Sequence, residues 1–189
     1  KPETQSIIDD NVVEIATDSR NSSVLATVTS TGHLNLYSDY QWSRSASGVS
    51  RNEQLLVSKH LNGVPNGLRV QFETDNTYHL LLRFKDRIEW LVFEPTRKPV
   101  AQDSHLSLKT QVIIKGDMPL SDFHLMAQGR LLMQTDAEGG YLLHDRESRV
   151  RSGAFPGISS LFGVRVLRSS FGLATIDEGN KISVFGLSY

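Results

Sequence analysis

The chain of 189 residues contains no cysteine, and this absence excludes several kinds of chemistry. Without thiols there is no disulfide, no thiolate metal site and no cysteine nucleophile. The compartment is left open, because an oxidising location is also compatible with a cysteine-free chain. At this length the chain is long enough to bury a substantial core without such links.

The chain also lacks a strong net charge and any long apolar run. Lys and Arg number 20 against 21 Asp and Glu, which gives a formal net charge of −1. No overall field attracts nucleic acid or anionic membranes, so a nucleic-acid partner is disfavoured. The apolar runs are a few residues long, far short of the roughly 20 that cross a bilayer.

The first residues do not have the pattern of a targeting segment. The first residue is Lys1, and no basic stretch followed by an apolar one comes after it. We therefore expect an excised portion or a processed product of a longer protein, and this expectation allows the parent protein to be anchored in a membrane.

Residue patterns for catalysis, cofactors and metals are missing as well. The six histidines are scattered, with no pair spaced by two, three or four residues, and neither a G-x-S-x-G elbow nor a phosphate-binding loop occurs. We therefore expect no enzymatic activity and no catalytic, cofactor-binding or metal-binding residues. The histidines are His33, His60, His79, His105, His124 and His144.

Four acidic residues fall in equivalent turns: Asp136, Glu138, Asp177 and Glu178. Oxygen ligands of this kind occur in calcium sites, but no loop has the full spaced set. Acidic residues with Gly are expected in hairpin turns for backbone reasons, so we interpret them as turn residues.

What the sequence does contain is short strand patterns. In Asn11–Asp39, two apolar runs enclose a polar turn, Thr31-Gly32 breaks the chain, and Leu34 and Leu36 then alternate with polar residues. Alternation at period two between turn residues predicts an antiparallel meander.

Three later segments repeat the order of these parts. The break before the third strand falls at Gly32, Asp86, Gly139 and Gly179, so the spacings are 54, 53 and 40 residues. Repeats of about 40 to 50 residues with about four short strands each are typical of β-propeller blades. We predict one all-β, β-propeller-like domain over residues 1–189, with about four blades of three to four antiparallel strands. The repeat units are residues 11–61, 66–117, 120–152 and 158–189.

The connections and outer strands are predicted from the same patterns. Asn62–Gly67 is a turn, and Gln54–His60 and Leu106–Lys115 are outer strands of the first two units. Gln5–Ile8 is a further strand. The segment Tyr40–Asn52 is rich in Ser, Gly and Arg, and we interpret it as a surface loop.

Parts of these units resemble known repeats. The segments SVLATVTSTGHLNLYSD, LLMQTDAEGGYLLHDRE and GLATIDEGNKISVFGLS are similar to the inner part of a WD-repeat blade. Ser38-Asp39 and His144-Asp145 stand where that family has Trp-Asp. Four units are fewer than most such propellers use, so the ring is either closed and compact or part of a larger ring. An incomplete ring would expose apolar faces on its terminal blades, which predicts self-association.

Two groups of residues are candidates for binding. Tyr40, Trp42 and Arg44 combine aromatic and Arg side chains in a Ser/Gly segment, as binding surfaces do, although Trp42 would serve equally well as packing between blades. Arg146, Arg149 and Arg151 form the one notable basic cluster. We interpret this cluster as a solvated loop, with an anion or partner contact as the alternative.

The function expected from these observations is a non-catalytic propeller that binds another protein or another domain of its own chain. The chain also resembles the soluble extracytoplasmic propeller segments in permease subunits of bacterial phosphate-type ABC importers. That resemblance implies a transport-associated, periplasmic location rather than a cytoplasmic one. The alternative is a small-molecule-binding or metal-binding propeller, an enzyme or a sensor, with its site at the central channel.

Overall fold

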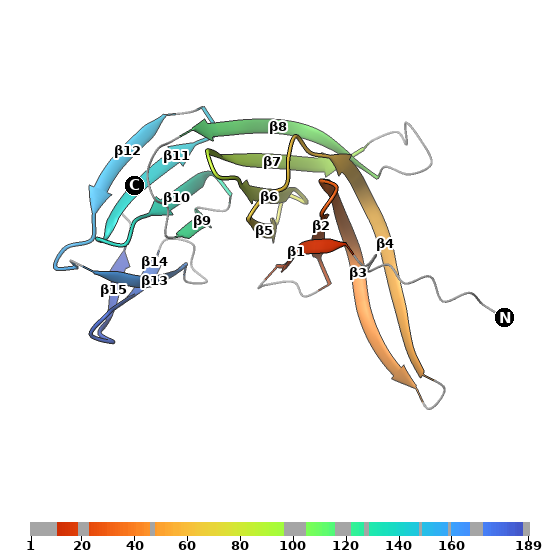
Figure 1. The fold of residues 1–189 in the computed structure, drawn as a ribbon, viewed down its shortest axis with the longest axis horizontal. Helices are drawn as coiled ribbons and strands as arrows, with labels where there is room; N and C mark the ends of the chain where they lie inside the picture. Colours follow the sequence, from red (N-terminus) through yellow and green to blue (C-terminus); the bar gives the residue numbers. More distant parts are fainter. Residues whose placement is uncertain are drawn as a thin grey trace. The chain divides into compact units, whose positions relative to one another are not determined.

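The computed structural model describes residues 11–18, 23–45, 48–96, 105–115, 122–126, 129–147, 149–158, 160–166 and 172–186. All regular elements in these ranges are β-strands, and they form four antiparallel sheets (Figure 1). This arrangement confirms the prediction of an all-β, propeller-like fold. The same ranges contain no helix long and apolar enough to span a membrane.

Each sheet is a meander in which successive strands pair in chain order. The first sheet comprises β1 (Val12–Thr17), β2 (Leu25–Thr29), β3 (His33–Ser45) and β4 (Gly48–His60). The second comprises β5 (Gly67–Phe72), β6 (Tyr78–Arg83), β7 (Arg87–Pro95) and β8 (Leu106–Lys115). The third comprises β9 (Asp122–Met126), β10 (Leu131–Thr135), β11 (Gly140–Asp145) and β12 (Val150–Ala154), and the fourth β13 (Leu161–Val166), β14 (Gly172–Asp177) and β15 (Ile182–Gly186).

The four sheets lie in successive parts of the chain, and the described turns at Gly32, Asn76 and Gly139 lie where turn residues predict them. Gly32 has φ +80° and Gly139 has φ +88°, a backbone conformation that favours glycine. Asn76, with φ 61°, takes the same conformation in the turn between β5 and β6. The strand predicted at Leu106–Lys115 coincides with β8.

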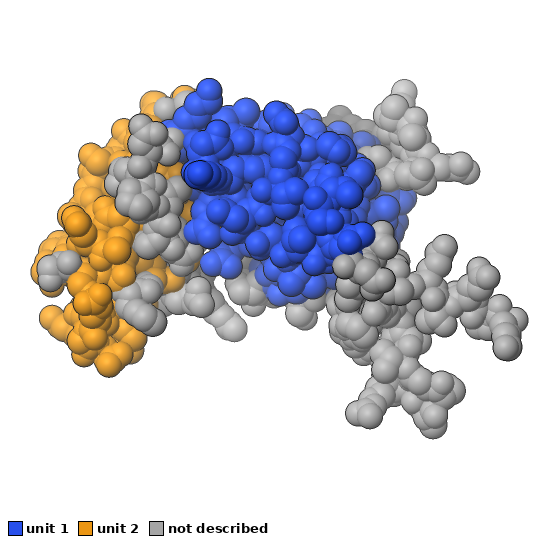
Figure 2. Space-filling view, viewed as in Figure 1, with its two compact units in different colours: residues 1–115 blue, residues 116–189 orange. Residues whose placement is uncertain are grey.

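The sheets divide into two compact units, which we call unit 1 (residues 1–115) and unit 2 (residues 116–189) (Figure 2). Within unit 1, the opening strand of one sheet contacts that of the next, β1 against β5, and within unit 2 β9 likewise contacts β13. Adjacent innermost strands of successive sheets are what blades in a propeller require.

The core of unit 1 is built from branched aliphatic side chains contributed by both of its sheets. Leu34, Leu36, Leu80 and Leu82 are completely buried in one cluster. Each belongs to an alternating or fully apolar strand, so the periodicity that predicted the strands also predicts which face is buried. Unit 2 has a separate core that includes Met126, Met133, Phe155 and Leu173.

One loop prediction is wrong. Residues 40–45 lie in β3 and residues 48–52 in β4, and the two strands pair from His33↔His60 to Ser45↔Gly48. The neighbouring strand β2 accompanies β3 only as far as Tyr37. Beyond that point β4 is the one strand that pairs with β3 in the described ranges, and the sequence there shows no hydrophobic alternation.

A second loop interpretation is partly wrong, because Val150–Ala154 forms strand β12 at the outer edge of the third sheet. Most of its residues are exposed, so its sequence carries no apolar period to predict a strand. The strand predicted at Gln5–Ile8 lies outside the described residues.

Candidate binding surfaces

The first predicted group, Tyr40, Trp42 and Arg44, lies on β3 in the part of the hairpin that extends past β2 (Figure 1). The backbone register pairs Trp42 with Arg51 and Arg44 with Val49. Cross-strand pairs and alternate residues share a face of a two-stranded ribbon, so these register positions belong to one face. The side chains of residues 39–45 and 48–53 lie outside the described part of the structure.

The second predicted group does not converge on one point. Arg146 donates from Nε and Nη2 to the carbonyl oxygen of Gly129, at 3.1 and 2.8 Å, and so fastens the turn between β9 and β10. Arg149 Nε lies 2.6 Å from Asp145 Oδ2, and Arg149 also forms an ion pair with Glu147 at 3.0 Å. Arg151 is exposed on β12. Arg146 therefore has a structural role, and Arg149 and Arg151 face solvent.

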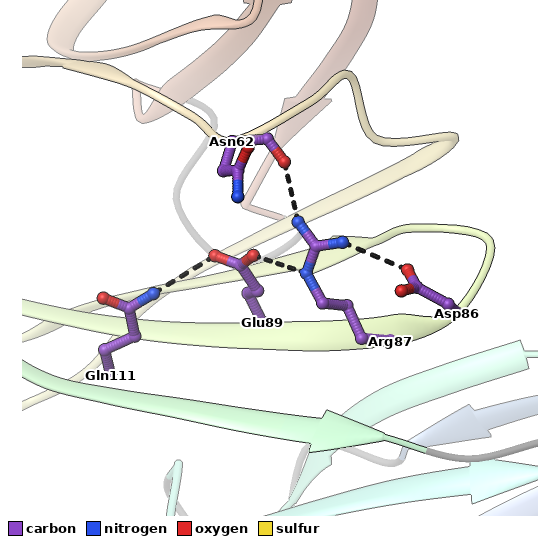
Figure 3. Close-up of polar contacts among 5 residues, drawn as sticks. All are labelled: Asn62, Asp86, Arg87, Glu89 and Gln111. Atoms are coloured by element: carbon purple, nitrogen blue, oxygen red, sulfur yellow. Dashed lines mark hydrogen bonds and ion pairs between the residues drawn. The ribbon is translucent and has the colours of Figure 1, made fainter.

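A polar network that sequence reasoning missed surrounds Arg87 in unit 1 (Figure 3). Arg87 donates from Nε to Glu89, from Nη1 to Asp86 and from Nη2 to the Asn62 carbonyl oxygen, at 2.8, 3.0 and 2.7 Å. Glu89 also accepts a 3.2 Å hydrogen bond from Gln111. The hydrogen bond to Glu89, the largest effect, raises the pKa of Arg87 above its ordinary value.

This network is structural, because the Glu89 side chain is only 8% exposed and the Arg87 guanidinium is engaged on three sides. It fastens the turn around Asn62 to the β6–β7 turn. Glu89 could have predicted this network from the sequence, because a charged residue inside the apolar run of β7 needs a partner of opposite charge.

A second buried network lies within the second sheet. Trp90 Nε1 donates to His79 Nδ1 at 3.1 Å, so Nδ1 is the acceptor and the imidazole proton sits on Nε2. Nε2 lies 2.9 Å from Thr77 Oγ1, which donates to Asp75 Oδ1 at 2.6 Å. The hydrogen bonds therefore run in one direction, from the indole to a carboxylate. His79 is completely buried, so the network orders the core rather than meeting a ligand.

The histidines that looked isolated in the sequence are partly brought together. His33 and His60 are cross-strand partners whose ring centroids lie 4.9 Å apart. In unit 2, His144 Nε2 lies 2.8 Å from Gln134 Oε1, and burial lowers the pKa of His144 below its ordinary value. Within the described ranges, no group of three or more His, Asp or Glu residues is arranged to hold a metal ion.

Large apolar side chains are exposed on several strands, including β1, β8 and β15. On β1, Val13 and Ile15 are 48% and 59% exposed, and on β15, Ile182 and Val184 are 69% and 68% exposed. Unit 2 also contains a cavity of about 210 Å³, whose lining residues are mainly apolar and aromatic. These include Met133, Tyr141, Phe155, Leu173 and Phe185.

Short strands in consecutive meanders, with opening strands in contact, define a propeller-like protein, and comparison with known structures supports this class. The chain is similar to the crystal structure of Sqt1 from Chaetomium thermophilum, a WD40 propeller protein, with 16% identity and a TM-score of 0.51. The match covers 93% of this chain and 44% of the Sqt1 chain, so this chain spans less than half of that protein. No protein-family model and no curated protein sequence matches the chain. The likeness to Sqt1 shows the fold.

Proposed function

We propose that this chain is a non-catalytic, propeller-like module that binds another protein or another domain of its own chain. The main contact surface is the part of the β3–β4 hairpin that carries Tyr40, Trp42 and Arg44. The observation that carries the proposal is the length of this hairpin, which continues to Ser45 although β2 stops pairing with β3 at Tyr37. Beyond Tyr37 the described strand that pairs with β3 is β4 alone, and this backbone arrangement supports a role of the hairpin in contacts.

The residues of this ribbon favour a protein partner with an acidic surface. Between Tyr40 and Asn52 the chain has two arginines, Arg44 and Arg51, and no Asp or Glu. Tyr, Trp and Arg are the residue types that most often dominate protein–protein binding energies. The formal net charge of −1 gives no general attraction to nucleic acid, so we favour an acidic protein segment.

Arg149 and Arg151 form a second, weaker contact surface on the third sheet. Arg149 is 73% exposed and paired with carboxylates near the surface, an arrangement that contributes little to stability and is easily exchanged for a partner's carboxylate. Arg146 supports this surface from its position on the Gly129 carbonyl oxygen.

A matched pair of variants tests the hairpin. The double variant Trp42→Ala/Arg44→Ala removes residues from one face of the ribbon, and Ser43→Ala/Ser50→Ala changes register positions on the other face. Proteins captured by the unmodified chain should be lost with the first variant and kept with the second, and calorimetry with the purified partner should give at least a tenfold weaker affinity. Equal binding by both variants would remove the hairpin from the contact surface.

The alternative is a small-molecule-binding or metal-binding propeller. The apolar cavity in unit 2 favours a small apolar ligand over a metal. Elemental analysis of the purified chain would detect a bound metal, and native mass spectrometry would detect a bound organic ligand. The transport-associated, periplasmic location that the resemblance to the permease segment implies stays a prediction. Membrane-spanning segments encoded on both sides of this stretch would support it.

A further inference from the structure

The connection between β4 and β5 contains two Asn-Gly pairs, Asn62-Gly63 and Asn66-Gly67. Asparagine is a chemically labile residue, because the backbone nitrogen of the next residue can attack its side-chain amide. Glycine at that next position leaves the approach open, since it has no side chain and few conformational limits. Both asparagines are exposed, so sequence and exposure alone give the two pairs equal reactivity.

The fold restrains the second pair strongly. Asn66 N–H donates to the Arg83 carbonyl oxygen at 2.8 Å. The Arg83 side chain in turn donates from Nε to Asn66 Oδ1 and from Nη2 to the Asn66 carbonyl oxygen, at 3.2 and 3.1 Å. Gly67 is the first residue of β5 and pairs with Arg83 across the ladder. The side-chain amide of Asn66 and the nitrogen that would attack it are therefore both held in place.

The first pair is restrained far less. Arg87 Nη2 donates to the Asn62 carbonyl oxygen at 2.7 Å (Figure 3), and in the part of the chain that the structure describes the Asn62 side-chain amide has no hydrogen-bond partner. Gly63 lies outside the strands with φ +106°, and a Cβ atom there would make ordinary contact, at 3.7 Å, with the Phe84 ring. The Asn62 side chain can thus rotate toward the Gly63 nitrogen without losing a hydrogen bond.

Charge does not separate the two sites, because both asparagine carbonyl oxygens accept a hydrogen bond from an arginine side chain. The carbonyl group and the following glycine nitrogen belong to one peptide group. In each pair the guanidinium therefore stabilises the anion that forms when that nitrogen loses its proton. The difference in restraint is what distinguishes the two pairs.

We propose that Asn62 is a site of spontaneous deamidation in the folded chain and that Arg83 protects Asn66 from the same reaction. The Gly63 nitrogen loses its proton to hydroxide and attacks the side-chain carbonyl carbon of Asn62. A bond forms between these two atoms, the bond from that carbon to Nδ2 breaks, and Nδ2 leaves as ammonia after taking a proton from water. The product is a cyclic imide.

Water then opens the imide at either of its carbonyl groups. Opening at the former side-chain carbonyl gives aspartate in an ordinary backbone, and opening at the former backbone carbonyl gives isoaspartate. The sum of the steps consumes one water and releases one ammonia, so no oxidant or reductant is needed.

Modification at Asn62 reaches the Arg87 network. In the isoaspartyl product the backbone runs through the former side chain, and the carbonyl group that accepts from Arg87 becomes part of a free carboxylate. The turn gains a backbone atom, and the network gains a negative charge. The inference goes beyond the proposed function and uses no residue of the β3–β4 contact surface, so either experiment can fail without the other.

Ageing of the folded full chain at neutral to mildly alkaline pH tests the proposal. Trypsin cleaves after Lys59 and Arg69, so one peptide carries both pairs, and its fragment masses assign each deamidation to an asparagine. Asn62 should react at least tenfold faster than Asn66 in the folded chain, and the two should react at similar rates in urea. Equal rates in the folded chain, faster reaction at Asn66, or no reaction at either site would each overturn the proposal.

The variant Arg83→Gln tests why Asn66 is spared. It removes both guanidinium contacts and should raise the rate at Asn66 at least fivefold without changing the rate at Asn62. Arg130→Gln, a matched change at an exposed arginine in unit 2, should alter neither rate. Circular dichroism checks that both variants fold, and the comparison within the unmodified chain stands without them. An unchanged rate at Asn66 in folded Arg83→Gln would overturn the protective role of Arg83.

Discussion

Units 1 and 2 are built from the same meander but are packed with different side chains. The core of unit 1 uses Leu and Val from both sheets, and Leu34, Leu36, Leu80 and Leu82 are fully buried. The core of unit 2 combines Leu161, Val164 and Leu173 with two methionines, Met126 and Met133, and with an aromatic stack around Phe155. Met is flexible and fills irregular space, whereas branched aliphatic residues pack with well-defined rotamers.

The two units also differ in how well their buried polar groups are hydrogen-bonded. In unit 1, buried His79 accepts a hydrogen bond from Trp90, and buried Glu89 accepts one from Gln111. In unit 2, the hydroxyls of Ser160 and Thr175 are buried and have no hydrogen-bond partner among the described residues, and a cavity of about 210 Å³ adjoins the core. Cavities and unsatisfied groups both lower stability, so unit 2 should open locally at a lower free energy than unit 1.

The largest effect is expected from a charge in the core of unit 1. Leu36 is completely buried, so Leu36→Asp should cost more than about 4 kcal/mol and unfold unit 1, whereas Val13→Asp, at a site 48% exposed on the same sheet, should change stability by less than about 0.5 kcal/mol. Thermal melting followed by circular dichroism measures both.

Hydrogen exchange on the Leu36→Asp variant extends the comparison to the whole chain. Protection lost in both units would support a single domain over residues 1–189, and protection kept in unit 2 would mean that the units fold independently. An unchanged melting temperature would contradict the core position of β3.

A smaller loss is expected when a buried hydrogen bond is broken. Trp90→Phe leaves His79 Nδ1 without its donor in a fully buried site and should cost about 1–3 kcal/mol. Adding His79→Leu removes the other partner and should recover part of the loss. Denaturant titrations of the single and double variants measure both steps.

The matched change in unit 2 is Gln134→Leu, which leaves His144 Nε2 without its acceptor. It should cost less than Trp90→Phe, because the looser core of unit 2 admits a compensating water more readily. A larger cost for Gln134→Leu, in denaturant titrations of both variants, would reverse the ranking of the two units.

Unit 1 was also the easier unit to predict from sequence. Its strands are apolar or alternating because they bury a face, and that period located β5, β6, β7 and β8. The apolar period is missing on the exposed strand β12 and on the part of the β3–β4 hairpin beyond the end of β2, which is why both segments looked like loops. The Arg87 network joins residues as distant in sequence as Asn62 and Gln111, and only the folded backbone brings them together.

Acid should act on unit 2 through His144. Burial lowers the pKa of His144 below its ordinary value of 6.5, so the unfolded chain binds its proton more readily than the folded one. The contribution of neutral His144 to the folding stability is therefore complete above pH 6.5, and it is lost as the pH falls through the lowered pKa. Melting temperatures measured from neutral to mildly acidic pH should decrease on the acid side, and His144→Gln should flatten that decrease. An identical pH profile in the variant would exclude His144 as the cause.

The smallest expected effect is a gain, at the edge of unit 2. A Cβ atom added at Gly186 would meet no other atom within 4 Å, and Gly186 has no positive φ, so Gly186→Ala should stabilise β15 by about 0.4–1 kcal/mol by restricting the unfolded chain. Gly157 has the same free space but φ +73°, so Gly157→Ala should be destabilising for backbone reasons alone. The two sites have the same free space for a Cβ atom and differ in φ. Opposite shifts in the denaturation midpoints of the two alanine variants would therefore show that the backbone conformation causes the change in stability. If both alanines destabilise, the end of β15 is constrained by contacts beyond the described residues, and the looseness inferred for unit 2 does not extend to its last strand.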